Sequence, residues 1–167
     1  MSGGGATSGP RVGWGFDAHP LNDEPPLVLG GVVVSETEGV SATSDGDVLA
    51  HAVTDAVFGA CVLGDIGEHF PSDDPAVEGA DSLVLLRQAV TMAMAMGWQP
   101  AHVDVTVVAE AIRVSPHRDE IRSRLAEAMA MSVDNVSVKA TTTDGLGFVG
   151  RGEGLAAVAL VTVEALP

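Results

Sequence analysis

The sequence predicts an α+β fold, with a mixed four-stranded β-sheet core, helices packed on one face of that sheet and a small N-terminal hairpin. Apolar residues recur at helical spacing in three segments, and short β-compatible runs lie before, between and after them. The strand-like runs outnumber the helices that could act as crossovers, which favours a mixed sheet over a parallel one. A chain of 167 residues is long enough for one domain with its own core.

Composition sets the expected domain organisation. The first ten residues are rich in Gly and Ser, so residues 1–10 are expected to form a disordered tail and residues 11–167 a single domain. The N-terminus lacks a basic segment followed by an apolar run, and no apolar stretch is long enough to span a bilayer. A cytoplasmic protein is therefore expected. The single cysteine, Cys61, lies in an apolar helical pattern and is expected to be buried and unreactive.

The chain is acidic, with a formal net charge of -15 and only 8 Lys and Arg residues. Such a charge disfavours contact with phosphate backbones and anionic lipids, so neither nucleic acid nor a membrane is expected as a partner. An acidic protein that handles a phosphorylated substrate must supply positive charge locally, through metal ions, helix N-termini and a few Arg side chains. Solubility alone also explains the acidity.

The N-terminal third is predicted to contain two strands and one helix. The segments Arg11–Asp17 and Leu27–Val34 are β-compatible and are separated by turn residues, so they are expected to pair as the opening hairpin, with Gly30-Gly31 as a bulge. From Asp47 to Leu63 the apolar residues follow the helical period of 3.6 residues.

The remainder of the chain alternates between helices and strands. Residues 64–79 are rich in turn formers and are expected to form an exposed loop. Only 4% of the residues are aromatic, whereas Ala and Val are abundant. The uncovered sheet face is therefore expected to carry small residues and to be covered by other subunits. Periodicity predicts, in order, a helix at 82–96, a strand at 103–109, a helix at 117–131 and strands at 136–141 and 155–164.

Asp17, His19 and His51 are candidate ligands of one metal ion. Side chains alternate along a strand, so Asp17 and His19 share one face of an extended segment. His51 lies one turn inside the predicted helix, on a polar face that it shares with Asp47 and Asp55. Two imidazoles and one carboxylate suit a zinc ion whose fourth position is left to water or substrate. The alternative is that these are unrelated polar residues.

A second candidate site follows the strand that ends at Thr141. Residues 139–154 run from this strand into a loop rich in Thr and Gly. Hydroxyls and backbone N–H groups can bind phosphate oxygens, and Arg151 can add a bidentate guanidinium. Asp144 offers an oxygen ligand to a hard cation such as Mg2+ or Mn2+. The alternative is a glycine-rich turn before an edge strand, because the run matches neither the P-loop nor the dinucleotide pattern.

Six ordered motifs carry a resemblance to a known family. They are Gly15-Phe16-Asp17-Ala18-His19, Ser44-Asp45-Gly46-Asp47-Val48 with His51 and Thr54-Asp55, Gly64-Asp65-Ile66-Gly67 with Phe70-Pro71, Gly79-Ala80-Asp81-Ser82, Asp104-Val105-Thr106, and Lys139 to Gly154. Over nearly the whole chain after the tail, the sequence resembles the 2-C-methyl-D-erythritol 2,4-cyclodiphosphate synthase family of the non-mevalonate isoprenoid pathway.

The resemblance implies a lyase that assembles as a homotrimer of α+β subunits, with three active sites at the subunit junctions. The substrate of the family is 4-diphosphocytidyl-2-C-methyl-D-erythritol 2-phosphate. Its 2-phosphate attacks the β-phosphorus and expels CMP, which closes the 2,4-cyclodiphosphate. An isoprenoid diphosphate on the trimer axis is a further partner that the resemblance suggests.

The resemblance also assigns the metal ligands by position. Asp17, His19 and His51 match the ligands of one zinc ion per subunit, with a diphosphate oxygen as the fourth ligand. Asp144 matches the acidic residue that helps to hold a second ion, Mg2+ or Mn2+, with the substrate. Asp55 lies one helical turn after His51, and this spacing predicts that Asp55 orients the imidazole.

Thr43 and Thr142 match the positions that stabilise the transition state. Asp65 and Gly67 match the ribose contacts, and residues 109–115 with Ala140 match the cytosine pocket. The full set of implied substrate contacts is Asp17, Ala18, His19, Thr43, Ser44, Asp65, Ile66, Gly67, Phe70, Pro71, Ser72, Asp73, Asp74, Ala109, Glu110, Ala111, Ile112, Arg113, Val114, Ser115, Ala140, Thr141, Thr142, Thr143, Asp144, Phe148 and Arg151.

The chain departs from the family pattern at a few of these positions. Thr43 stands where the family commonly has His, so it can form hydrogen bonds but offers no cation. Asp144 replaces the usual Glu and is one methylene shorter. At the cytosine pocket, Ile112 replaces Pro and Arg113 replaces Lys. None of these changes removes a zinc ligand, so an active enzyme is expected.

Two alternatives from other functional classes stay open. One is a zinc hydrolase of phosphoesters, which needs a metal-bound water and a nearby base such as Asp47 or Asp55. The other is a trimeric protein that binds isoprenoid diphosphates without catalysis, where Phe16, Phe148 and Arg151 line a cavity on the trimer axis.

Overall fold

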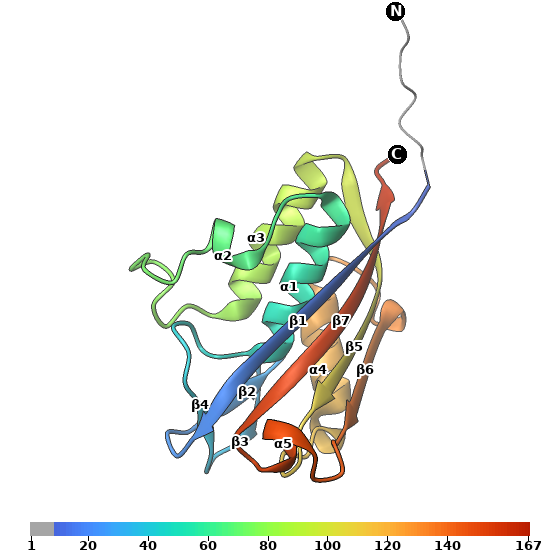
Figure 1. Ribbon diagram of the computed structural model, residues 1–167. Helices are drawn as coiled ribbons and strands as arrows, with labels where there is room; N and C mark the ends of the chain where they lie inside the picture. Colours follow the sequence, from blue (N-terminus) through green and yellow to red (C-terminus); the bar gives the residue numbers. More distant parts are fainter. Residues whose placement is uncertain (1–8) are drawn as a thin grey trace, which may run out of the picture.

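The computed structural model describes residues 9–167, which build a five-stranded sheet with helices against it (Figure 1). The strand order is β4-β1-β7-β5-β6. β5 and β6 are parallel and the other neighbours are antiparallel, which confirms the predicted mixed sheet. Most of the predicted tail, residues 1–8, lies outside the described residues. The strands are β1 (Arg11–Asn22), β4 (Gly39–Val40), β5 (Trp98–Val108), β6 (Val136–Thr141) and β7 (Gly154–Ala165).

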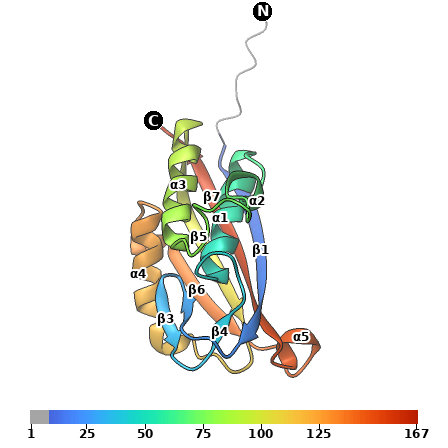
Figure 2. The same ribbon diagram turned by 90° about the vertical axis from the view of Figure 1, so that its left-hand side faces the viewer.

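Three long helices lie on one face of the sheet, as predicted (Figure 2). α1 packs on β1 and β7, α3 on α1 and β5, and α4 on β6. Within the described part of the chain, none of the helices is long and apolar enough to cross a membrane. The helices are α1 (Val48–Cys61), α2 (Ile66–His69), α3 (Ser82–Ala95), α4 (Arg118–Ala128) and α5 (Gly147–Gly150), with 3-10 turns at Ser115–His117 and Val133–Asn135.

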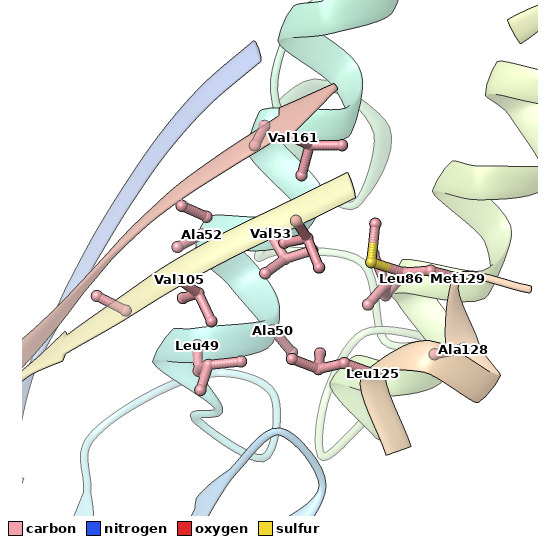
Figure 3. Close-up of a cluster of buried hydrophobic side chains, with 14 of the residues drawn as sticks. Leu49, Ala50, Ala52, Val53, Leu86, Val105, Leu125, Ala128, Met129 and Val161 are labelled. Carbon is pink, nitrogen blue, oxygen red and sulfur yellow. The ribbon is translucent and has the colours of Figure 1, made fainter. Parts of the chain in front are cut away.

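The core lies between α1, α3 and the sheet. Figure 3 shows Leu49 and Val53 of α1 and Val105 of β5 in one cluster with Leu86 of α3 and Met129 at the end of α4. All five side chains are almost completely buried. Full burial of side chains of this size contributes roughly 1.5–3 kcal/mol each. Cys61 also belongs to this core, which confirms the prediction that it is buried.

Small residues allow α1 to approach β1 closely. A Cβ atom at Gly13 would overlap the carbonyl oxygen of Ala56, and one at Gly15 would overlap that of Ala52. The prediction that small residues lie on the uncovered sheet face is wrong for β1, which exposes Val12, Trp14 and Phe16 on that face. Gly13 and Gly15 face α1 instead, because only glycine leaves room for the helix backbone at Ala52 and Ala56. The close contact also brings α1 side chains within reach of those on β1.

The predicted opening hairpin is wrong in its pairing. β1 pairs with β7, whereas β2 (Leu27–Leu29) and β3 (Val32–Ser35) form a separate two-stranded sheet. Gly30 and Gly31 form the turn between β2 and β3, and both have a positive φ, 58° and 74°. Two consecutive positive φ angles are what a two-residue hairpin turn requires, so the glycines make a turn and not a bulge.

The main sheet has five strands and not the predicted four. The additional strand, β4, has only two residues and pairs with Leu21 and Asn22 at the end of β1. A strand of two residues is too short to show an alternating pattern in the sequence. The same reason applies to α2 and α5, single four-residue turns in segments predicted as loops.

Candidate active site

Three side chains from β1 and α1 converge, as predicted. The Oδ2 atom of Asp17 lies 2.9 Å from Nε2 of His19 and 3.0 Å from Nδ1 of His51. The two ring nitrogens are 3.2 Å apart. Two imidazole nitrogens and a carboxylate oxygen are a donor set that zinc accepts. Among residues 9–167 this is the one cluster of such ligands close enough together to hold a metal ion.

The side chains of this metal triad shift one another's pKa values. Burial alone would raise the pKa of Asp17, but hydrogen bonds from His19 and His51 outweigh burial and lower it to about 2. Burial alone would lower the pKa of His51, but its hydrogen bond with Asp17 and the nearby carboxylates raise it. Without metal, a proton therefore occupies the triad readily. The triad is built to attract a positive charge.

The other ring nitrogen of His51 is also engaged. Its Nε2 lies 2.9 Å from Oγ of Ser82 and 3.0 Å from Oγ of Ser44. Ser82 is fully buried at the start of α3 and donates its hydroxyl hydrogen to Asp45. Sequence reasoning did not assign Ser82 or Asp45 to the site. The only signal was that both belong to the motifs that carry the family resemblance.

The prediction that Asp55 orients His51 is wrong. The Oδ1 atom of Asp55 accepts the backbone N–H of Ile66 at 2.7 Å, and both ring nitrogens of His51 have other partners. A spacing of four residues brings two side chains to one helix face, but the unpaired N–H at the start of α2 is a stronger attraction for a carboxylate. Asp55 thus anchors α2 beside the metal triad.

A cavity of about 620 Å³ opens beside the metal triad. β1, α1, α2 and the loop after α2 supply its walls. Asp74 lies with Thr43, Ser72 and Asp73 in an adjoining pocket of about 390 Å³. The backbone carbonyl of Thr43 accepts the N–H of Gly79 at 2.9 Å, which ties this loop down. The predicted site residues that line the larger cavity are His19, Thr43, Ser44, His51, Ile66, Gly67, Phe70, Pro71, Ser72 and Asp73.

A second cavity, of about 500 Å³, lies at the C-terminal ends of β5 and β6. Residues 109–116 and 140–142 line it, so the structure brings together the predicted cytosine pocket and the first part of the Thr and Gly loop. The two cavities share no lining residue. In the sheet, β7 separates β1, which bears two of the metal ligands, from β5. Within one chain the two cavities are therefore separate.

Glu110 connects the lining of the second cavity to the Thr and Gly loop. One oxygen of its carboxylate accepts the backbone N–H and the hydroxyl of Thr143, both at 2.9 Å, and the N–H of Gly145 at 3.2 Å. These three hydrogen bonds lower the pKa of Glu110. Glu110 was predicted as a substrate contact, and the structure shows that its carboxylate holds the Thr and Gly loop.

Several predicted site residues line neither cavity. Asp65 caps α2 by accepting the N–H of Glu68 at 2.9 Å. Asp144 has a positive φ of 53° and accepts the Thr142 hydroxyl at 3.3 Å. Arg151 forms a bidentate pair with Glu153, at 2.8 and 2.9 Å. The predicted residues outside both cavities are Asp17, Ala18, Asp55, Asp65, Asp74, Thr143, Asp144, Phe148 and Arg151, of which Asp74 lines the adjoining pocket.

The model of the YgbB family matches residues 10–164. This chain belongs to the YgbB family. A similar protein from Idiomarina loihiensis is 51% identical over 154 residues, which are 92% of this YgbB chain and 97% of the relative. One from Pectobacterium atrosepticum is 53% identical over 153 residues, 90% of this chain and 93% of the relative. Both relatives are named 2-C-methyl-D-erythritol 2,4-cyclodiphosphate synthase.

Solved structures share the fold of this YgbB chain. The bifunctional IspDF from Campylobacter jejuni matches with a TM-score of 0.92 and 39% identity, over 95% of this chain and 43% of that longer chain. A CDP complex of IspF from Plasmodium falciparum matches with a TM-score of 0.84 and 27% identity, over 97% of this chain and 100% of that chain. The agreement confirms the predicted mixed α+β fold.

Proposed function

We propose that this chain is a 2-C-methyl-D-erythritol 2,4-cyclodiphosphate synthase, an enzyme of isoprenoid biosynthesis. The observation that carries the proposal is the metal triad of Asp17, His19 and His51 beside a cavity of about 620 Å³, in a chain half identical to proteins of that name. A cavity of this size is typical of sites for small molecules. The CDP in the plasmodial relative supports a cytidine nucleotide as the ligand class.

The proposed substrate is 4-diphosphocytidyl-2-C-methyl-D-erythritol 2-phosphate. An oxygen of its 2-phosphate forms a bond to the β-phosphorus. The bond from the β-phosphorus to the bridging oxygen breaks, and CMP leaves with that electron pair. The attacking phosphate is already ionised near neutral pH, so no side chain needs to remove a proton. Catalysis then depends on alignment and on neutralising charge.

The chain's residues divide these tasks between the two cavities. Asp17, His19 and His51 would hold zinc, which supplies Lewis acidity and a fixed anchor for the diphosphate when bound. Thr142 and its neighbours offer hydroxyls and N–H groups to phosphate oxygens at the second cavity. Thr43, at the first cavity, offers a hydroxyl to the developing charge.

Asp144 is the proposed protein ligand of a second ion, Mg2+ or Mn2+. Magnesium sites commonly use one or two carboxylates, several waters and the phosphates of the substrate. The carboxylate of Asp144 fits this pattern because it lies on an exposed loop beside the hydroxyl of Thr142. The second ion would therefore bind together with the substrate.

We further propose a homotrimer with active sites at the subunit junctions. The separation of the two cavities supports it, since a junction can bring the first cavity of one chain to the second cavity of its neighbour. The uncovered sheet face also carries Val12, Trp14, Phe16 and Leu160, each between 44% and 64% exposed. The Trp14 and Phe16 rings stack with centroids 6.2 Å apart. Apolar patches of this kind are typical of subunit interfaces.

An isoprenoid diphosphate on the trimer axis is the proposed further ligand. Phe16 and Phe148 are partly exposed apolar side chains that could contact its hydrocarbon tail. Arg151 could bind the diphosphate, although a bidentate pair with Glu153 engages it in the single chain. Binding would therefore require the diphosphate to compete with the Glu153 carboxylate.

The proposal is tested by incubating the purified chain with the cytidyl substrate and Mg2+ or Mn2+ in 18O-labelled water. CMP and the cyclic diphosphate should form in equal amounts and without label from the solvent. Linear products that contain 18O would indicate a phosphoester hydrolase instead. His51→Ala should lose zinc and turnover, whereas Asp23→Asn, in an exposed loop, is the control that should keep both.

A further inference from the structure

A chain of hydrogen bonds runs from the metal triad away from the cavity. The Nε2 atom of His51 lies 2.9 Å from Oγ of Ser82, which donates to Oδ1 of Asp45. The other oxygen of Asp45 accepts the backbone N–H of Ser82 at 3.0 Å, and Oδ1 also accepts that of Asp47 at 3.2 Å. Ser82 is fully buried at the first position of α3. These contacts join α1 to the N-terminus of α3.

The direction of each hydrogen bond follows from counting protons. An ionised carboxylate can only accept, so the one hydroxyl hydrogen of Ser82 is committed to Asp45. Oγ of Ser82 therefore faces His51 as an acceptor, and the hydrogen between them belongs to Nε2 of His51. A neutral imidazole that carries its hydrogen on Nε2 has its lone pair on Nδ1. Nδ1 is the nitrogen that lies 3.0 Å from Asp17 in the metal triad.

We propose that Ser82 and Asp45 are positioning residues, which hold His51 in the tautomer and ring orientation that present Nδ1 to the metal ion. The proposal rests on the zinc site of the proposed function. Buried hydrogen-bond partners of this kind fix the geometry of metal-ligating histidines and increase their basicity. The Asp45 carboxylate is itself held at the N-terminus of α3, where backbone N–H groups favour a negative charge.

Ser44 is the competing partner of the same nitrogen. Its Oγ lies 3.0 Å from Nε2 of His51, but Ser44 lines the cavity, whereas Ser82 is fully buried. Among the described residues, Asp45 accepts the Ser82 hydroxyl, and the Ser44 hydroxyl has no carboxylate acceptor. The hydroxyl of Ser44 thus stays available for a substrate phosphate, while Ser82 has the permanent role.

The test is zinc binding and nitrogen NMR of the full chain, loaded with zinc alone and labelled with 15N at histidine. In the wild type, we expect zinc on Nδ1 of His51 and a slowly exchanging hydrogen on Nε2. Ser82→Ala should weaken zinc binding, measured by competition with a chelator, by about 10- to 100-fold. The same variant should accelerate exchange of the Nε2 hydrogen. Asp45→Asn should change both readouts in the same direction and provides a second variant if Ser82→Ala does not fold.

Asp81→Ala is the matched control. Asp81 caps the same helix by accepting the N–H of Leu83 at 2.8 Å, so its loss weakens α3 without breaking the hydrogen bonds to His51. Zinc affinity and Nε2 exchange should stay at wild-type values in this variant. The proposal is overturned if Ser82→Ala and Asp45→Asn behave like the wild type, if Asp81→Ala shows the same losses, or if only Ser44→Ala accelerates exchange.

The experiment separates this proposal from the proposed function. A wild type that binds zinc through Nδ1 of His51 but forms no cyclic product would refute the enzyme activity and leave the positioning role intact. An active cyclase whose Ser82→Ala variant binds zinc normally would refute the positioning role alone. A wild type that binds no zinc at the metal triad would overturn both.

Discussion

The His51 ring is held in place by residues from three segments of the chain. Its Nδ1 faces Asp17 on β1, and its Nε2 faces Ser44 before α1 and Ser82 on α3. The contact with Asp17 raises the pKa of His51, and the hydrogen bonds from His19 and His51 together lower the pKa of Asp17 to about 2. A proton and a metal ion therefore compete for one nitrogen. Without metal, the folded protein carries an ion pair at this point.

This ion pair predicts the pH dependence of the metal-free protein. A lowered Asp17 pKa stabilises the fold above the ordinary value of 3.8, and this stabilisation is lost as the pH falls through about 2. A raised His51 pKa stabilises the fold below 6.5, and this is lost as the pH rises through the folded value. Between pH 3.8 and 6.5, Asp17→Asn should lower the free energy of unfolding by roughly 2 kcal/mol.

Urea denaturation in the presence of a chelator measures this difference at each pH. The gap between the wild type and Asp17→Asn should shrink toward pH 2 and again above the folded pKa of His51. Asp23→Asn, in an exposed loop, is the control and should show no such window. A gap of equal size at every pH would contradict the ion pair.

At the scale of the elements, the start of α1 is fixed by one buried carboxylate. Asp47 caps α1 by accepting the N–H of Ala50 at 3.0 Å. It also accepts the N–H groups of Gly30 and Gly31, at 2.9 and 2.7 Å, from the turn between β2 and β3. Asp47 therefore connects the small sheet to the helix that carries His51.

Asp47→Ala should destabilise the protein by about 3 kcal/mol, because it leaves three N–H groups, two buried and one partly buried, without an acceptor. Asp47→Asn keeps one acceptor oxygen and should cost less. Asp65→Ala removes the exposed cap of the short helix α2 and should cost only about 1 kcal/mol. Denaturant titration of the three variants gives the ranking, and equal losses for Asp47→Ala and Asp65→Ala would contradict this role of Asp47.

At the C-terminal end of α1, Val62 has a backbone conformation that valine rarely adopts. Val62 has φ 59° and ψ 44°, a left-handed conformation, and its side chain is 81% exposed. This conformation costs a non-glycine residue roughly 1–2 kcal/mol, and a β-branched residue is among the least suited to it. Val62 gains nothing from burial to offset the strain.

Val62→Gly should therefore stabilise the protein by about 0.5–1 kcal/mol, which is the strain relieved less the greater entropy of glycine in the unfolded chain. Val84→Gly is the matched control, because Val84 is a partly exposed valine inside α3, where glycine lowers helix stability. Thermal and chemical unfolding should shift upward for Val62→Gly and downward for Val84→Gly. A loss of stability in both variants would show that Val62 is not strained.

The elements that the sequence predicted well are the long ones, in which the apolar pattern repeats several times. α1, α3 and α4 each span eleven or more residues, enough for the apolar stripe to recur. β1 was found, but its partner was not, because strand pairing depends on contacts that lie far apart in the sequence. Gly13 and Gly15 fit against α1, and β1 pairs with β7, but neither contact leaves a local signal in the sequence.

Only part of the candidate site, like only part of the fold, could be predicted from the sequence. Asp17 and His19 were predicted to share a face from strand alternation, and His51 from its place on the helix. Ser82 lies 31 residues after His51 and 37 after Asp45, so no periodicity could connect it to either. The prediction for Asp55 was wrong for a different reason. Helical spacing gave the direction of its side chain but could not show that the N–H of Ile66 would occupy its carboxylate.

At the scale of the whole molecule, the two cavities and the uncovered sheet face support an active site shared between chains. In the proposed function, the metal triad and the Thr and Gly loop both contact the substrate, yet within one chain the cavities beside them are separate. The sheet face with Trp14 and Phe16 is uncovered in the single chain. Burial of that face between copies would bring residues of different chains together. The proposed active site then belongs to a pair of chains.

This arrangement predicts that two inactive variants restore activity when they assemble together. His51→Ala removes a metal ligand from the first cavity, and Thr142→Ala removes a phosphate contact from the second. Each variant alone should lose most of its turnover. When the two variants assemble at random in a 1:1 mixture, about a quarter of all junctions should combine the intact first cavity of one chain with the intact second cavity of its neighbour. Turnover should recover to about that fraction of the wild-type value.

The variants are unfolded together, refolded as a mixture, and assayed for CMP release. The controls are each variant refolded alone and the two variants mixed without unfolding, none of which should gain activity. If each active site lay within one chain, every chain of the mixture would still carry one lesion, and no activity could return. Recovery on mixing therefore requires that neighbouring chains share a site, whereas its absence in correctly assembled mixed trimers would place the whole site in a single chain.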